Sequence, residues 1–565
     1  MSFSKESLAR IGLLYVVTAS CVHAQTTPDA GLLRQQIERQ LPQVLPEERK
    51  PLTVLPPAYK PAPGLSVTVK AFRFVGNTLM SQADLAPAVA SYLDRPLDFT
   101  ALQAATAAVS EAYRAAGWLV RVYLPRQEIQ DGIVTLQIVE GIFGKLRFEG
   151  TLSMRIDAGR VEATVAAAQP AGQPLKAGAL DRAMLLLDDL PGIAVSGNLA
   201  PGSGSAESDL VLKLADEALL NGEASLDNTG LRSTGRERVT ANASLNSPLQ
   251  IGDQVIANLV HTEGSDYIRL AYTAPVGYDG LRLGVNASRM DYKVISEEFK
   301  AARITGASST WGLDAQYPLI RSRTHNLFLS ASWDDKIFDN EANGAVSSKY
   351  GVRNLNVGLM ANLFDRLGGG GANMANMMFT VGNLDLEGSP NKSSDTATTR
   401  THGGFTKLRY AMSRQQALTE DFSLYALFTG QSASKNLDSS EKFYLGGSSG
   451  VRAYPASEGG GSEGTMLNLE LRWRAMNHLL ITGFYDWGSV KVNKDNNFAG
   501  APALNRFDLD GLGASVTWNG PLGVTLKGVY ARRLGSNPNR NATTGRDQDG
   551  SLIRDRLWLT ASLPF

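Results

Sequence analysis

Two short polar segments carry the side chains that could do chemistry, and each holds one charged residue. Residues 446–455 read GGSSGVRAYP and contain Arg452, and residues 483–488 read GFYDWG and contain Asp486. The opposite charges of the guanidinium and the carboxylate invite pairing between a glycine-rich loop and the segment that follows it. A plainer interpretation, in which Arg452 is an exposed loop arginine, remains open at this point.

The first segment also matches the G-x-S-x-G pattern of serine hydrolases, as do residues 460–464. That pattern requires a strand before the serine, a helix after it, and aspartate and histidine partners. No helical pattern follows either match, and His478 is the only downstream histidine. Both matches are therefore interpreted as loop glycines, and no catalytic residue is predicted.

Composition argues against other kinds of site. The five histidines have no metal-ligand spacing, and residues 368–371 lack the third glycine of a dinucleotide loop. Lys plus Arg and Asp plus Glu both number 55, so net charge gives no reason to expect a nucleic-acid partner. We expect no metal, no cofactor and no nucleic acid.

The N-terminus is typical of a secretory signal. Residues 1–24 combine two basic residues, the apolar run IGLLYVVTASCV and a small-residue pattern that ends at Ala24. An alternative is a lipoprotein signal acylated at Cys21, although Thr18 stands where a leucine is expected. Cleavage after Ala24 leaves the mature chain without cysteine.

The rest of the chain is expected to be rich in strands and to form more than one domain. A length of 565 residues exceeds one ordinary core, and 56 glycines favour many tight turns. No apolar run after the signal approaches the ~18 to 20 residues of a membrane helix. If the exported protein spans a membrane, it must do so as a closed barrel.

Residues 25–41 contain a short amphipathic helix, because Leu33, Ile37 and Leu41 recur at a spacing of four. By itself this pattern fits a helix docked on any neighbouring surface. Residues 42–66 are rich in proline, which predicts an extended, semi-rigid linker.

Residues 67–216 contain one β-α-α-β-β order twice, which predicts an internal repeat. The first copy has expected strands at 67–74, 119–124 and 133–139 and helices at 81–93 and 99–116, with a bulge at Ala71. The second has strands at 145–149, 193–199 and 209–214 and helices at 161–168 and 179–187. Each copy leaves a sheet edge that could accept a strand from another chain.

From residue 217 onward, apolar and polar residues alternate in segments of about ten residues, the pattern of a transmembrane β-barrel with a wet lumen. In the clearest segment, residues 467–474, three leucines and Trp473 alternate with Asn468, Glu470 and two arginines. A soluble sandwich gives similar alternation. The last segment places apolar residues on one face up to the terminal Phe565, which fits a barrel-closing outer-membrane strand.

Five motifs occur along the chain: GVRAYP at 450–455, the F-x-D-x-G of Phe484, Asp486 and Gly488, LDNTGLRSTG at 226–235, LPRQEIQDGIVTLQIVEG at 124–141 and PLGVTLKGVYARRLG at 521–535. Through these motifs the sequence resembles the TpsB transporters of two-partner secretion, the ShlB/FhaC/HecB family of the BamA-like superfamily. The resemblance covers nearly the whole mature chain.

The resemblance implies a mainly β fold. It places a plug helix at 25–41, a linker at 42–66, POTRA domains at 67–143 and 144–216, and a sixteen-stranded transmembrane barrel at 217–565, with a loop around 446–464 folded inward.

The resemblance further implies that Arg452 binds Asp486 on the inner wall, supported by Val451, Tyr454, Phe484 and Gly488. Strand parity agrees independently, because Phe484 and Asp486 share one face. A planar guanidinium suits bidentate binding of a fixed carboxylate. Ala453 departs from the glycine that the family often has there.

The implied protein is a Gram-negative outer-membrane translocase, with POTRA domains in the periplasm. It would pass an unfolded TpsA-type exoprotein, such as an adhesin, haemolysin or contact-dependent toxin, to the cell surface. Outer-membrane lipid and the barrel-assembly machinery, through Phe565, are further expected partners. Residues that bind the exoprotein stay unassigned within 67–216. The alternatives are a substrate-selective pore and a barrel-assembly factor.

Overall fold

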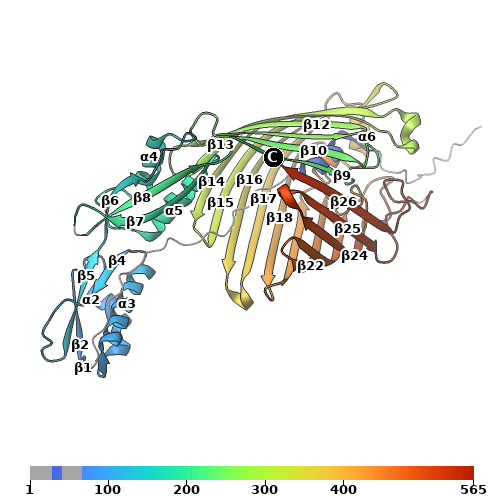
Figure 1. Cartoon of the computed structure of the whole chain (residues 1–565). Coiled ribbons are helices and arrows are strands. Elements are labelled where there is room, and N and C mark those ends of the chain that lie inside the picture. The colour runs from blue at the N-terminus through green and yellow to red at the C-terminus, as the bar shows by residue number, and fades with distance from the viewer. Residues whose placement is uncertain (1–27, 41–65, 205, 542) are drawn as a thin grey trace, which may run out of the picture.

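The computed structural model describes residues 28–40, 66–204, 206–541 and 543–565 (Figure 1). The predicted signal at 1–24 lies outside the described residues, as does the linker at 42–66 except for Ser66. Two small α/β units stand in a row at one end of a large barrel, and β1 and β2 lie farthest from it.

The first unit surrounds a three-stranded sheet in the order β2-β5-β4, with β2 parallel to β5. Its elements are β1 (Ser66–Thr68), β2 (Ala71–Val75), α2 (Gln82–Val89), β3 (Pro96–Asp98), α3 (Phe99–Ala115), β4 (Val120–Tyr123) and β5 (Ile133–Glu140). Ser81 caps α2 in a capping box with Asp84, so this helix begins where its sequence signal lies.

The bulge expected at Ala71 is wrong. The chain breaks there between two strands, because β1 pairs with β3 whereas β2 pairs with β5. The carbonyl of Val69 accepts the Asp94 amide at 2.8 Å, and the Gly132 carbonyl accepts the Lys70 amide at 2.8 Å. These distant partners bend the chain, and the alternation of side chains does not reveal them.

The second unit repeats the arrangement, with a sheet in the order β6-β8-β7 and β6 parallel to β8. Its elements are β6 (Ile142–Phe148), α4 (Ala158–Ala168), α5 (Ala177–Asp188), β7 (Ile193–Pro201) and β8 (Glu207–Asp216). Backbone hydrogen bonds join the two units: the Leu119 amide donates to Leu175 at 3.0 Å, and the Leu175 amide donates to Gly141 at 2.8 Å. The side chain of Lys176 lies over the Trp118 ring, 5.2 Å from its centre.

The second unit is docked on turns at one end of the barrel. Arg321 and Arg323 pair with Asp189 and Asp181 at 2.7 and 2.8 Å. In a third pair the charges are reversed, because Arg182 of α5 in the second unit pairs with Asp279 of a barrel turn at 3.0 Å. Three ion pairs thus attach this unit to two successive turns.

Sixteen antiparallel strands form the closed barrel, which confirms the predicted fold class. They are β9 (Leu220–Asp227), β10 (Arg238–Asn246), β11 (Gln254–Thr262), β12 (Ser265–Val276), β13 (Leu281–Lys293), β14 (Thr305–Arg321), β15 (His325–Ala342), β16 (Ala345–Asp365), β17 (Gly371–Asp385), β18 (Gly403–Ala417), β19 (Phe422–Ala433), β22 (Glu463–Met476), β23 (Leu479–Lys491), β24 (Arg506–Asn519), β25 (Thr525–Arg533) and β26 (Asp555–Pro564).

The last strand closes the barrel against the first. The register pairs β26 with β9 from Thr560 to Pro564, and Phe565 and Gly222 then exchange backbone hydrogen bonds of 2.9 and 3.0 Å. The ring of Phe565 lies over Gly222, where a Cβ would come within 2.5 Å of it. Outward leucines such as Leu557 and Leu559 are about half exposed, as expected of side chains that face lipid.

Helix α1 (Ala30–Glu38) lies inside the barrel and is drawn in blue in Figure 1. Asp29 caps it by accepting the Leu32 amide at 2.9 Å, and the Ala30 amide donates to Asn340 of β15, also at 2.9 Å. Leu33 is buried against the inner wall, and Ile37 is partly buried there. Among the described residues, no helix is both long and apolar enough to cross a membrane.

Candidate functional site

The glycine-rich segment belongs to a long loop, residues 434–462, that joins β19 to β22 and folds back into the lumen. We call it the inward loop. Within it, β20 (Phe443–Tyr444) pairs with β21 (Gly460–Gly461) to form a two-stranded base. The expected loop around 446–464 lies almost wholly within it, except that Glu463 and Gly464 belong to β22.

Arg452, at the centre of the inward loop, contacts Asp486 on β23. Its Nε and Nη2 donate to the two carboxylate oxygens at 2.8 and 2.7 Å, and its backbone amide donates a third bond at 3.0 Å. Asp486 is fully buried, and Arg452 is 7% exposed. Buried charges are tolerated only when they are paired and hydrogen-bonded, so this geometry fixes the loop against the wall.

Two further residues that sequence reasoning did not assign complete this pair. Glu470 on β22 accepts Arg452 Nη1 at 2.8 Å, and Asn468 donates to Asp486 at 2.7 Å. Asn468 also donates to the Gly450 carbonyl at 3.1 Å. Both residues lie on the polar face of the alternating segment 467–474, so the alternation already indicated that their side chains face the lumen. Their register against β23 depends on the strand pairing.

The predicted supporting residues surround the same point. The ring of Phe484 lies beneath the Arg452 guanidinium, with 3.5 Å between the guanidinium carbon and the ring centre. Val451 and Tyr454 are buried in one cluster with Phe484. Gly488 faces Leu445, because a Cβ at Gly488 would lie 2.6 Å from a Leu445 methyl group. The structure thus brings Arg452, Asp486 and all four supporting residues together.

Ala453 fits without backbone strain. It is not among the eight non-glycine residues with positive φ in the described part of the chain. Its Cβ instead points at Gly511 of β24, where an added Cβ would lie only 2.6 Å away. A glycine on the wall therefore provides the space that the alanine on the loop occupies.

The inward loop also holds helix α1. Ser439 donates to Asp29 at 2.8 Å, Gln35 donates to the Lys442 carbonyl at 2.6 Å, and Arg39 donates to the Tyr444 carbonyl at 3.0 Å. Gly31 lies so close to the loop that a Cβ would meet Ser440 at 2.8 Å. One face of the helix thus rests on the loop, while Leu33 rests on the barrel wall.

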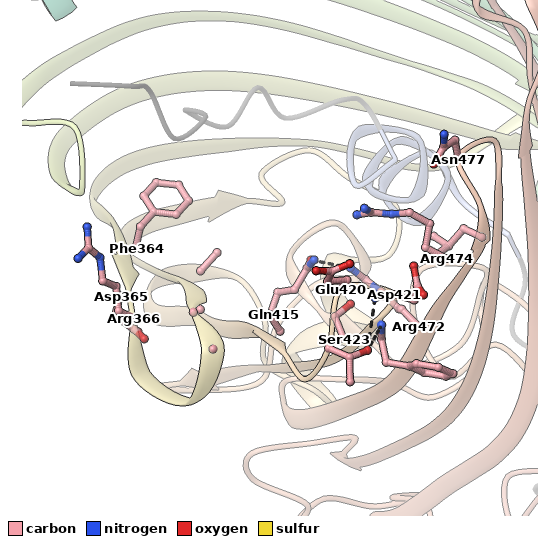
Figure 2. Close-up of a pocket in the computed structure, with 18 of the residues that line it drawn as sticks. Phe364, Asp365, Arg366, Gln415, Glu420, Asp421, Ser423, Arg472, Arg474 and Asn477 are labelled. Carbon is pink, nitrogen blue, oxygen red and sulfur yellow. Dashed lines mark hydrogen bonds between the residues drawn. The ribbon is translucent and has the colours of Figure 1, made fainter. Parts of the chain in front are cut away.

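A cavity of about 580 Å³ opens at the end of the barrel that carries the two α/β units (Figure 2). It is lined by the turns that join β16 to β17, β18 to β19 and β22 to β23. Figure 2 shows Asp365 and Arg366 on one side and Arg474 and Asn477 on the other. Thr324, beside the docked Arg323, also lines it, so the cavity adjoins the attachment of the second unit.

The sequence model of haemolysin secretion/activation proteins ShlB/FhaC/HecB matches residues 206–516, which is more than half of the chain, and the ShlB-type POTRA model matches residues 67–141. The heme/hemopexin transporter protein HuxB of Haemophilus influenzae is 26% identical over 548 residues, covering 94% of this chain and 95% of that protein.

The outer membrane transporter CdiB of Dickeya dadantii is 25% identical over 476 residues, covering 82% of this chain and 81% of that protein. The solved structure of CdiB from Escherichia coli superposes with a TM-score of 0.71 at 20% identity, covering 91% of this chain and 94% of that one, a likeness of fold.

Proposed function

This chain belongs to the ShlB/FhaC/HecB family of haemolysin secretion/activation proteins, and from that premise we propose how it exports its cargo. It is an outer-membrane transporter of two-partner secretion that secretes a partner exoprotein, with its POTRA domains in the periplasm. In our proposal the exoprotein is unfolded and of TpsA type. It meets the POTRA domains, displaces helix α1 and passes through the lumen.

We divide the chain accordingly. Residues 1–24 are the signal, 25–41 the plug, 42–66 the linker, 67–143 and 144–216 the POTRA domains, and 217–565 the barrel. The proposed boundary at 143/144 lies within β6, and the one at 216/217 lies just after the end of β8.

Capture of the exoprotein would use strand addition at a POTRA sheet. Among the described residues, β2 and β4 each pair only with β5, so both edges of the first sheet keep unused backbone donors and acceptors. An extended segment can bind such an edge through main-chain hydrogen bonds. The residues within 67–216 that choose the cargo are left unassigned.

The observation that carries the proposal is the joint obstruction of the lumen. Helix α1 contacts both the inward loop and the wall, and the loop is held to the wall by Arg452 and Asp486. A conduit for an unfolded chain must clear the helix, and we assign Arg452 and Asp486 the role of a lock that keeps the loop in register while it does so.

Deletion of the gene, followed by an assay of the partner exoprotein in the culture supernatant, tests the activity. We expect the exoprotein to be lost from the medium and restored by the intact gene on a plasmid. Unchanged secretion in the deletion strain would rule the proposal out.

A substrate-selective pore is the competing function, and it needs no POTRA domains. Removal of residues 67–215 distinguishes the two, because a pore would keep its solute uptake and biological function whereas an exoprotein transporter would stop secreting. Two POTRA domains and the VRAYP form of the motif argue against a barrel-assembly factor.

We assign no catalytic activity to the chain. Among the described residues, no group of three or more His, Cys, Asp or Glu side chains could hold a metal ion.

Insertion of the barrel into outer-membrane lipid by the barrel-assembly machinery, guided by the terminal Phe565, is part of the same proposal.

A further inference from the structure

A second set of contacts holds the inward loop, and it lies away from Arg452. The loop that joins β25 to β26, described at residues 534–541 and 543–554, folds over the inward loop at the end of the barrel opposite the POTRA domains. We call this segment the covering loop.

The first contact runs through Tyr454. The guanidinium of Arg533, the last residue of β25, lies over the Tyr454 ring, with 4.6 Å to the ring centre. Asp547 of the covering loop accepts both ends of that guanidinium at 2.8 and 2.5 Å. The Asp547 side chain is fully buried, and Asn537 donates to it at 2.9 Å. The covering loop thus fixes the arginine on which Tyr454 packs.

The second contact runs through Glu458, four residues after Tyr454. Glu458 is fully buried, although it belongs to a polar loop. Its two carboxylate oxygens accept the Asn539 side-chain amide at 2.8 Å and the Gln548 backbone amide at 3.0 Å. Both donors belong to the covering loop. A buried carboxyl group is costly unless it is hydrogen-bonded, so the covering loop stabilises Glu458 in its buried position.

The polar partners in these contacts differ from those of Arg452. Asp486, Glu470 and Asn468 lie on β22 and β23, whereas Arg533, Asp547 and Asn539 belong to β25 and the loop that follows it. Two residues connect the sets, because Tyr454 shares a buried cluster with Phe484 and Trp558 of β26 donates to the Arg452 carbonyl at 2.9 Å.

We propose that Glu458 and Asp547 form a second latch, in which the covering loop holds the C-terminal half of the inward loop inside the lumen independently of the pair Arg452–Asp486. Both are positioning residues. Glu458 belongs to the inward loop and binds the covering loop directly, whereas Asp547 belongs to the covering loop and holds the inward loop through Arg533 and Tyr454. Opening this latch releases residues 454–460 toward the cell surface while Arg452 stays bound.

The test measures loop position and not secretion, so it can fail while export stands. Ala456 is buried in the inward loop and is replaced by cysteine as a reporter. Whole cells are treated with a membrane-impermeant maleimide, and labelling rates are compared. The parent chain without the reporter gives the background labelling, because cleavage after Ala24 removes Cys21, the one native cysteine.

Glu458→Gln and Asp547→Asn, each made in the reporter chain, are expected to raise the labelling rate at least about tenfold, because each replaces a carboxyl oxygen that accepts a buried hydrogen bond with an amide donor. Asp508→Asn, which changes an exposed aspartate on β24, is the matched control and is expected to label at the parent rate. A second reporter, Val352→Cys, is buried beside the plug on another part of the wall and is expected to stay unlabelled in both variants.

Arg452→Ala combined with either variant is expected to label faster than each single variant, as two independent attachments require. Parent-level labelling in both latch variants would overturn the proposal. So would equal labelling of Val352→Cys, or loss of the folded-barrel band on unheated gels in both variants, because the two carboxylates would then serve barrel stability in general.

Discussion

At the scale of single residues, buried ion pairs hold the inward loop against the barrel wall. Arg452 donates to two carboxylates, Asp486 and Glu470, and its guanidinium also covers the Phe484 ring. Removing one member of a buried pair leaves the other charge uncompensated, which costs about 3 to 5 kcal/mol. Arg452 therefore makes a large contribution to the free energy that holds the inward loop against the wall.

Arg452→Ala is expected to reduce secretion of the partner exoprotein strongly while the barrel still assembles. Lysine at this position cannot bridge Asp486 and Glu470 in the same plane, so Arg452→Lys is expected to recover little. Supernatant exoprotein reports export, and the heat-modifiable band reports folding. Arg289→Ala, which removes an exposed arginine from β13, serves as the control. Secretion at the parental level by Arg452→Ala would refute the role of the lock.

Gly488, two residues after Asp486, lies in close contact with Leu445 of the inward loop. Gly488→Val would place its Cβ 2.6 Å from a Leu445 methyl group, so the loop base must shift, at a cost of about 1 to 3 kcal/mol. We expect the temperature at which the folded band disappears to fall. Gly483→Val lies on the same strand with no atom within 4 Å of its Cβ and should leave that temperature nearly unchanged. Equal shifts for the two variants would contradict the steric account.

At the scale of elements, strand and helix periodicity predicted most of what the structure contains. The helix that begins after Ser81, the repeated α/β order and the face of β23 that carries Asp486 all follow from local pattern. The break at Ala71 did not, because Val69 and Lys70 bind residues far along the chain. Likewise, Glu470 and Asp547 were visible as charges, but only strand register and loop closure bring them to Arg452 and Arg533.

Glu140 shows how the first α/β unit ties its elements together. Its carboxylate accepts the Leu79 and Thr78 amides at 2.8 and 2.7 Å and the Tyr113 hydroxyl at 3.0 Å. Burial acts to raise the pKa of Glu140, but these hydrogen bonds outweigh it and hold the pKa below its usual range. The carboxylate thus stabilises the turn before α2 above its unfolded pKa of about 4.3, and this is lost as pH falls through the lower folded value.

Glu140→Gln is expected to speed hydrogen exchange at Thr78 and Leu79 at pH 7. The difference from the parent should shrink as the pH falls below about 4, because the parent carboxylate is then protonated as well. Comparison of variant and parent at each pH cancels the intrinsic pH dependence of exchange. Glu128→Gln, an exposed change in the same unit, should leave exchange unaltered. A difference that persists undiminished at low pH would show that the effect is not one of charge.

At the scale of the whole molecule, Phe565 contributes to the seam that closes the barrel. Phe565 adds two backbone hydrogen bonds to the seam and covers Gly222 with its ring. The register between β26 and β9 is otherwise the shortest between neighbouring strands of the barrel. Because few residues pair across this seam, the two hydrogen bonds of Phe565 are a large fraction of those that join β26 to β9.

Deletion of Phe565 is expected to lower the amount of folded barrel in outer-membrane fractions, since the seam loses both the hydrogen bonds and the ring. Leu552→Ala, which shortens an exposed leucine in the covering loop, should not. The ratio of folded to unfolded band in unheated samples measures the effect. A parental ratio after deletion would show that the other seam contacts suffice.

The joint between the two POTRA domains has a mechanical consequence. Backbone hydrogen bonds cross it at Leu119, Gly141 and Leu175, and ion pairs at Arg321 and Arg323 fix the second domain to the barrel turns. Because hydrogen bonds and ion pairs fix both connections, we expect the two domains to move together as one rigid arm. If the exoprotein binds the first domain as we propose, a pull on it would apply a torque to the turns beside the cavity at the barrel mouth, so force as well as affinity would reach the lumen from the periplasm.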